Sequence, residues 1–264
     1  MDAFSKLTSH YILYEKPLNE TMRLLLRLDA LFTRYSQLSA DNHPITLDEK
    51  LSVLLRLIAI TDRADLKSKL TQLVHQLILR LQQWQKHKDA HQAPILEALQ
   101  QAQHCLAYFD QTRDKIGHHL REHFFVKQLL AQFNHPGGLT NFSLPIYALW
   151  QQQILEQKGH DIHDWMKEFN PLKSCIELLL KFIRQNSDCK TAWVDNGFYQ
   201  QPIDTKKTIQ IFQVKVPIAF NVYPNISVGR HHVSIHFHHV PQAGFDMSEP
   251  YAKPFECQLC FCDL

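Results

Sequence analysis

Glycine is scarce in this sequence, with only seven among 264 residues, and no glycine-rich phosphate-binding loop is present. The "PGG" at Pro136–Gly138 lacks the lysine and the serine or threonine that complete a P-loop, so it predicts a turn. The nucleophile elbow G-x-S-x-G, the zinc motif H-E-x-x-H and acidic loops for hard cations are also missing. These absences argue against an enzyme, and we expect neither catalytic residues nor a cofactor nor a bound metal.

Strong net charge and long apolar runs are missing as well. The formal charge is +2 with histidine neutral, which is too small for a nucleic-acid binder that depends on many phosphate contacts. The N-terminal stretch contains Asp2, Lys6 and His10 but no signal-peptide core, and nothing later is long enough to span a bilayer. Six cysteines, three of them in the last eight residues, make no disulfide framework for a chain this large. We expect a cytoplasmic protein that binds neither nucleic acid nor membrane.

The sequence has two regions with different hydrophobic periodicity. In the first, apolar residues recur at three- and four-residue steps, which predicts helices at 14–36, 46–60, 63–88, 94–110, 113–134, 144–157 and 171–185. Asn19 is placed as an N-cap, "TLDE" at Thr46–Glu49 as a capping box, and Pro171 in a first turn. The helices at 63–88 and 94–110 predict a hairpin whose leucine stripe is core, with a partner-helix role as the minor alternative.

The second region alternates with a period of two residues, as strands do. The runs "TIQIFQVKV" from Thr208, "HVSIHF" from His232 and "PFECQLCFC" from Pro254 predict strands, and "NG" at Asn196–Gly197 predicts a tight turn. No helical crossover lies between these strands, so they should pair antiparallel. The sequence therefore predicts an α+β fold, with an all-α N-terminal domain at 1–187 packed against an antiparallel β domain at 188–264.

Five of the 17 histidines in the chain lie in the ten-residue segment "HHVSIHFHHV", which begins at His231. On an extended strand, His232, His236 and His238 share one face while apolar residues occupy the other. The favoured interpretation is a half-buried strand with a solvated imidazole face. Such a face would become positively charged under mild acidity.

A zinc-binding module or metal-dependent enzyme is the alternative from another class. It would join the histidines to Cys257, Cys260 and Cys262, because zinc is bound by thiolates and imidazoles in a tetrahedral shell. On a strand, however, Cys260 and Cys262 face one side and Cys257 the other. Buried free cysteine is an ordinary small apolar residue, so packing is the preferred interpretation.

Six stretches occur in a fixed order along the chain: "YEKPLNETMRLLLRLDALF" at 14–32, "IGHHLREHFF" at 116–125, "PGGLTNFSLPIYALW" at 136–150, "FNPLKSCIELLLKFIRQ" at 169–185, "NGFYQ" at 196–200, and "YPNIS" with "VSIHF" at 223–237. Together they resemble the ZapD family of bacterial cell-division proteins, over nearly the whole chain from Tyr14. The resemblance implies a cytoplasmic, non-enzymatic homodimer at the mid-cell division ring. It also implies binding to the C-terminal tail of the tubulin-like protein FtsZ, so that a dimer with two tail sites crosslinks and bundles FtsZ filaments.

The resemblance further implies a basic tail-binding surface. In this sequence the matching residues are Arg27, Arg63, Arg121, Arg230, His231, His232 and His236. Arginine and protonated histidine donate strong hydrogen bonds to carboxylates, which suits an acidic peptide. From the residues alone, Arg27 and Arg121 could equally be surface arginines paired with the acidic neighbours Asp29 and Glu122.

Two positions depart from the family pattern. Ala148 stands where relatives have histidine, and Phe124 stands where a basic residue can follow Arg121, so part of the pocket should differ. Because histidine stands here in place of arginine, we expect tail binding to be more sensitive to pH than in an arginine-rich relative. Nucleic-acid binding by the same strand is a weak third interpretation, because aromatic residues are not interleaved with the basic patch.

Overall fold

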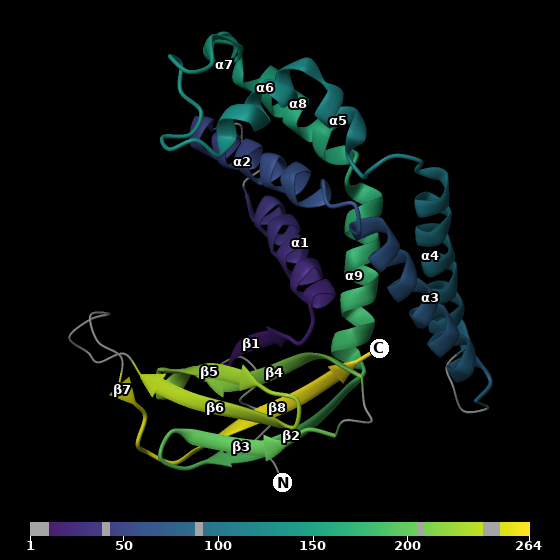
Figure 1. Cartoon of the computed structure of the whole chain (residues 1–264), viewed down its shortest axis with the longest axis vertical. Coiled ribbons are helices and arrows are strands. Elements are labelled where there is room, and N and C mark those ends of the chain that lie inside the picture. Colours follow the sequence, from purple (N-terminus) through teal and green to yellow (C-terminus); the bar gives the residue numbers. More distant parts are fainter. Residues whose placement is uncertain (1–10, 39–42, 88–91, 205–207, 240–248) are drawn as a thin grey trace. The chain divides into compact units, whose positions relative to one another are not determined.

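The computed structural model describes residues 11–38, 43–87, 92–204, 208–239 and 249–264. The chain forms two compact units. The β unit combines the segment that ends at Arg23 with Lys181–Leu264, and the helical unit is Leu24–Leu180. Helices followed by antiparallel sheets confirm the predicted α+β fold (Figure 1).

The β unit contains two antiparallel sheets. The first has the order β1-β4-β8-β2, formed by β1 (Tyr11–Pro17), β4 (Ile209–Pro217), β8 (Phe255–Asp263) and β2 (Ser187–Val194). The second has the order β3-β6-β5, formed by β3 (Phe198–Pro202), β6 (His232–His239) and β5 (Val222–Val228). The short β7 (Glu249–Pro250) pairs with β6, and the 3-10 turn η1 (Ile218–Phe220) follows β4. All pairings are antiparallel, as predicted from the missing crossovers.

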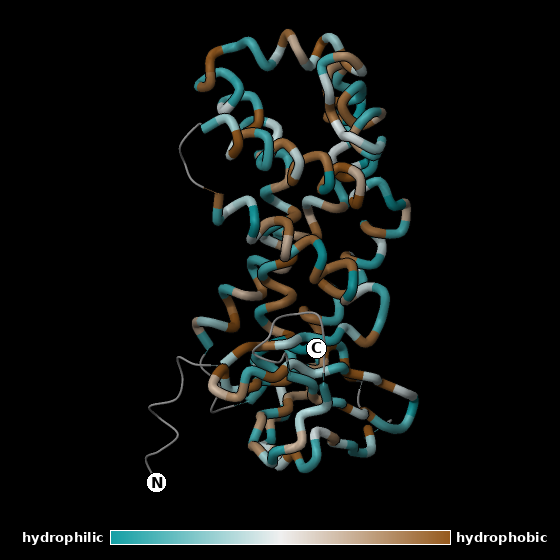
Figure 2. Tube along the Cα trace, turned by 90° about the vertical axis from the view of Figure 1, so that its left-hand side faces the viewer, coloured by the Kyte–Doolittle hydropathy of each residue, from teal (hydrophilic) through white to brown (hydrophobic). Residues whose placement is uncertain are grey.

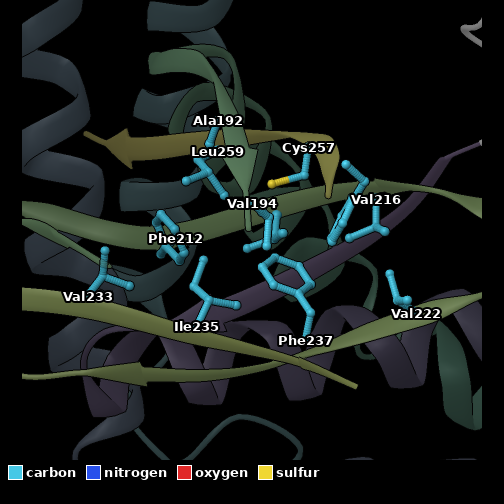
Figure 3. Packing of buried hydrophobic residues seen from close by; sticks show 12 residues of the cluster. Ala192, Val194, Phe212, Val216, Val222, Val233, Ile235, Phe237, Cys257 and Leu259 are labelled. Carbon is cyan, nitrogen blue, oxygen red and sulfur yellow. The ribbon is translucent and has the colours of Figure 1, made fainter. Parts of the chain in front are cut away.

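The core of the β unit lies between the two sheets. Val233, Ile235 and Phe237 of β6 are fully buried and point toward side chains of the first sheet such as Phe212 and Leu259 (Figure 3). The intervening positions of β6 are histidines and a serine. The predicted division of this strand into an apolar and an imidazole face is confirmed.

A tight turn joins β2 to β3. Asn196 has φ 49° and Gly197 has φ 65°, the two positive values that a type I′ hairpin turn requires. A Cβ on Gly197 would lie 2.4 Å from the carbonyl oxygen of Tyr251, so glycine is needed both for its φ and for this close approach. The turn predicted at "NG" is confirmed.

The N-terminal prediction is wrong in one respect. A helix was expected from residue 14, but Tyr11–Pro17 is a strand that pairs with β4. The run "YILYE" is aromatic and β-branched, and Pro17, which has no N–H, is tolerated because β1 is an edge strand. This strand places an N-terminal segment in the β unit, so the two units do not follow the predicted division at residue 187.

Nine helices fall within the described residues. They are α1 (Glu20–Gln37), α2 (Pro44–Thr61), α3 (Leu66–Gln85), α4 (Gln92–Gln111), α5 (His118–Glu122), α6 (Phe124–Phe133), α7 (Pro145–Gln151), α8 (Leu155–Lys167) and α9 (Asn170–Gln185). The predicted hairpin is α3 packed on α4, and its leucine stripe is buried at Leu66, Leu70, Leu73, Leu77 and Leu81. Asn19 caps α1 as predicted, because its Oδ1 accepts a hydrogen bond from the Met22 N–H at 2.8 Å.

Three helix predictions need correction. The helix α2 begins at Pro44, before the proposed capping box at Thr46–Glu49, because proline is favoured in a first turn. The helix expected at 113–134 is interrupted at His123, whose extended backbone separates α5 from α6. The helix expected at 144–157 ends at Gln151, and α8 was not predicted.

The hydropathy of the chain alternates at short intervals. Figure 2 shows hydrophobic residues interspersed with hydrophilic ones along the helices and strands. Across the described segments, no helix has the length and apolar character needed to cross a bilayer.

Candidate functional site

The hairpin between β5 and β6 carries three of the predicted site residues. The Gly229 N–H donates to the His232 carbonyl at 2.9 Å, which closes the turn, and the His231 carbonyl accepts from the Ile203 N–H at 2.8 Å. The side chains of Arg230, His231 and His232 are therefore held on a backbone tied to β3. All three residues are exposed, as a binding surface requires.

His236 lies further along β6 on the outer face of the second sheet. It is exposed and stands opposite Phe198 of β3 and Asn225 of β5 in the strand register. The imidazole and the Phe198 ring pack with centroids 4.8 Å apart, and Phe198 is itself 41% exposed. This face offers imidazole N–H groups beside an aromatic surface.

A surface cavity of about 450 Å³ opens next to Arg230 within the β unit. Three cations line it, namely Lys16, Arg23 and Arg230, together with one acid, Asp204. The rest of the lining is mainly aliphatic and comprises Pro17, Leu18, Ile203, Ile209, Val228 and Gly229. An apolar floor with a cationic rim can hold a branched side chain while it binds a carboxylate.

The helical unit holds the other three predicted residues. Arg27 is exposed on α1. Arg63 lies between α2 and α3, and its Nε is 3.3 Å from the Asp65 carboxylate, which also binds Lys69 at 2.6 Å. Hydrogen bonds from Lys69 and then Arg63 lower the pKa of Asp65 to about 2. Arg63 thus belongs to a surface ion-pair network and is still 38% exposed.

Arg121 has a packing role that the sequence resemblance did not indicate. Its guanidinium donates to the carbonyls of Ile116 at 2.8 Å and Ile58 at 2.7 Å, and to the Thr61 hydroxyl at 2.8 Å. The side chain is only 14% exposed. Burial lowers the pKa of Arg121 while the charge of Asp62 acts in the opposite direction, and arginine stays protonated in proteins. Its donors close the C-terminal turn of α2 and point away from solvent.

The structure therefore gathers the predicted residues into two groups. Arg230, His231, His232 and His236 share one hairpin of the β unit. In the helical unit, Arg63 pairs with Asp65 and Arg121 with Asp62 near the corner between α2 and α3, while Arg27 lies apart on α1. The two positions expected to depart from the family pattern lie elsewhere in the helical unit: Phe124 is 66% exposed at the start of α6, and Ala148 is half-buried on α7.

The cysteines of β8 do not converge on one point. Cys257 packs in the core between the sheets, which agrees with the prediction that it faces the side of the strand opposite to Cys260 and Cys262. Cys260 forms a disulfide with Cys189 of β2. Burial raises the pKa of the Cys257 and Cys262 thiols to about 12, which keeps them protonated. Within the described ranges, no group of three histidine, cysteine or acidic side chains could hold a metal ion. The zinc alternative finds no support in this geometry.

Sequence reasoning missed two features of the β unit. Lys16 and Arg23 lie in the "YEKPLNETMR" stretch, but they join Arg230 only because β1 is a strand, and this strand was read as helix. The Cys189–Cys260 bond was missed because the two residues are 71 positions apart and become neighbours only through the pairing of β2 with β8. The aromatic and β-branched residues Tyr11, Ile12 and Tyr14 were the available signal for the first feature.

Comparison with known proteins decides the family. The family model described as ZapD, a cell division protein, matches residues 26–236. The chain belongs to the ZapD family. Two relatives named "Cell division protein ZapD", from Coxiella burnetii strains RSA 331 / Henzerling II and RSA 493 / Nine Mile phase I, are each 35% identical over 226 residues. Each match covers 86% of this chain and 88% of the relative, and ZapD is a family of cell division proteins rather than a known class of enzymes.

Proposed function

We propose that this chain is a cytoplasmic division factor that binds the acidic C-terminal tail of FtsZ and, as a homodimer, crosslinks FtsZ filaments at the mid-cell ring. Membership of a cell division family supports the process. The observation that carries the binding mode is the cavity lined by Lys16, Arg23 and Arg230 beside the exposed histidines of β6. A dimer with one such site per chain would hold two tails and so bridge two filaments.

The chemistry of this cavity suits a peptide tail better than a bare anion. The cations attract carboxylates at long range, and the aliphatic floor formed by Leu18, Ile209 and Val228 rewards burial of an apolar side chain. His231 and His232 add donors next to Arg230. Arg27 and Arg63 give the helical unit exposed cations of its own, and Arg121 contributes by holding the α2–α3 corner in place.

Charge reversal in the cavity tests the binding mode. In co-sedimentation with FtsZ filaments, the double variant Lys16→Glu with Arg230→Glu should lose most bundling, because repulsion of an acidic tail replaces attraction. Raised salt should also weaken bundling by the wild-type chain, because it screens the attraction between the cations and the acidic tail. The matched control reverses two exposed lysines of the same unit, Lys181→Glu with Lys253→Glu, and should bundle normally. Equal loss in both double variants would show a net-charge effect and no specific site.

The crosslinking step depends on the oligomeric state. Light scattering of the purified chain should give twice the 31.0 kDa of one chain. A dimer that binds tails accounts for bundling through two sites. A monomer that still bundles filaments would require two tail sites on one chain and would contradict the dimer model.

A further inference from the structure

We propose that Cys189 and Cys260 form a reversible thiol–disulfide site that low-molecular-weight disulfides oxidise and that fastens the edge strand β2 to β8. The two residues face each other directly in the antiparallel pairing of β2 with β8, and their Cα atoms are 4.1 Å apart. Residues that face each other in a narrow antiparallel pair ordinarily lie about 4.5 Å apart. The bond can therefore form and open without a change of strand register.

Solvent exposure determines which of these two sulfurs reacts first with an external reagent. All six cysteines lie in the part of the chain that the structure describes, and five of them are buried. Cys189 alone among these six is exposed, on the edge strand β2 of the first sheet. Cys260 lies fully buried beneath it. An external reagent can therefore reach Cys189, whereas Cys260 is covered.

The buried cysteines nearby are poor competitors. Cys257 and Cys262 flank Cys260 on β8, and burial raises the pKa of both thiols to about 12. The thiolate is the nucleophile in disulfide exchange. Both thiols are covered from solvent, and neither faces Cys189, because Cys257 stands opposite Ala192 and Cys262 opposite Ser187. Of the cysteines on β8, only Cys260 is placed to form a bond with Cys189.

The exchange proceeds in two balanced steps with a small disulfide such as oxidised glutathione. The Cys189 thiolate attacks one sulfur of the reagent, the reagent's S–S bond breaks, and one glutathione thiolate leaves. The Cys260 thiol, which faces Cys189, then loses its proton as it attacks the Cys189 sulfur of the mixed disulfide, and the second glutathione leaves with its electron pair. The protein loses two protons and two electrons, and the reagent gains them as two thiols.

Oxidation has a defined structural consequence. The bond joins residues 71 positions apart and encloses β3 to β7 in one covalent loop, which includes the hairpin with Arg230 and His232. It also fastens the edge strand β2 to β8. A crosslink that closes a long loop restricts the unfolded chain, so the oxidised β unit should be more stable than the reduced one. Glutathione-buffered reducing conditions would keep the pair open.

Thiol counting on the intact chain tests the reaction. The fully reduced protein should titrate six thiols in denaturant, and incubation with oxidised glutathione should leave four. Peptide mapping should join Cys189 to Cys260, and the melting temperature should rise by about 5 °C or more. The variant Cys189→Ser should keep its five remaining thiols and show no oxidant-dependent shift. The control Cys262→Ala, two positions from Cys260 and also buried, should still lose two thiols.

Several results would overturn the proposal. They are six free thiols after strong oxidation, a stable glutathione adduct at Cys189 without the crosslink, a crosslink between other cysteines, or identical melting temperatures for the two states. None of these outcomes depends on FtsZ binding, so this inference and the proposed function can fail separately.

Discussion

At the scale of single residues, Arg121 shows how a residue predicted to contact a partner can act through the fold. Three of its hydrogen bonds end on Ile58, Thr61 and Ile116, and its side chain is nearly covered. A buried charged donor with good geometry is costly to remove, because its acceptors are left without partners. Arg27, exposed on α1, is the residue of this pair that a ligand can reach.

Replacement of Arg121 by methionine should lower the free energy of unfolding by about 2 kcal/mol or more, since the acceptors at the end of α2 lose their donor. Arg27→Met should stay within about 0.5 kcal/mol of the wild type, as surface changes do. Urea unfolding followed by circular dichroism measures both. If Arg121→Met kept full stability but lost tail binding, the side chain would be a ligand contact and its assigned role would be wrong.

Glu15 gives the β unit a pH-dependent contribution. Burial raises its pKa, but hydrogen bonds from Arg184 and Gln213 and the Arg184 charge outweigh this and leave the pKa below its ordinary value. Arg184 holds both carboxylate oxygens, at 3.0 Å and 2.8 Å. In the unfolded chain, the pKa of a glutamate carboxyl is about 4.3. The stabilisation is therefore fully present above that pH and is lost as pH falls through the lower folded pKa.

Glu15→Gln should accordingly cost about 1 kcal/mol at pH 7, because a half-buried bidentate pair loses its anion. The difference between variant and wild type should shrink as pH falls below about 4. Denaturant unfolding over a pH series checks this. Glu177→Gln, which removes a partner 3.8 Å from Lys173 on an exposed helix face, should show little difference at any pH.

At the scale of elements, the sequence predicts best where one periodicity lasts long enough. The α3–α4 hairpin and the two faces of β6 follow directly from the spacing of Leu66–Leu81 and Val233–Phe237. Short elements were missed because local signals compete. Tyr11–Pro17 precedes a strong helix cap at Asn19, so the helical pattern was extended over a strand that exists only through pairing with β4. The Cys189–Cys260 bond depends on register, which no local pattern carries.

The β2–β3 turn tests how strictly the backbone requires glycine. Gly197→Ala should lower the free energy of unfolding by about 2 kcal/mol or more, since it adds a clash with the Tyr251 carbonyl to the cost of a positive φ. Gly138 is a matched control, because its φ is also 65° and no described atom lies within 4 Å of the added Cβ. Gly138→Ala should cost only about 1 kcal/mol. Equal losses would mean that the close approach at Gly197 is unimportant.

At the scale of the whole molecule, this member of a cell division family carries a surface with exposed arginine, lysine and histidine side chains on its β unit. The candidate residues could be predicted only as a set from the family resemblance. In the structure most of them are exposed, whereas Arg121 is largely buried and donates hydrogen bonds to the C-terminal turn of α2. Lys16 and Arg23 complete the cavity at Arg230 through a strand that the sequence pattern concealed. Exposed histidines lie beside this cavity, and histidine is the side-chain type that commonly serves as a pH switch in proteins.

Co-sedimentation with FtsZ filaments should therefore be stronger at pH 6 than at pH 8 for this chain. Protonated His231, His232 and His236 would add positive charge next to Arg230, and His236 packs against uncharged Phe198 and Asn225. The triple variant with glutamine at these three positions should bind with less dependence on pH. Equal sedimentation of the wild type at both pH values would show that these histidines do not contribute to tail binding.

The most direct test is a titration of a labelled FtsZ C-terminal tail peptide with the intact chain at low salt, followed by fluorescence anisotropy. We predict saturable binding that weakens as salt rises and a dissociation constant at least about tenfold higher for Lys16→Glu with Arg230→Glu. The control Lys181→Glu with Lys253→Glu should bind within about twofold of the wild type. No saturable binding by the wild type, or the same affinity in the cavity variant, would contradict the central claim that this basic cavity holds the tail.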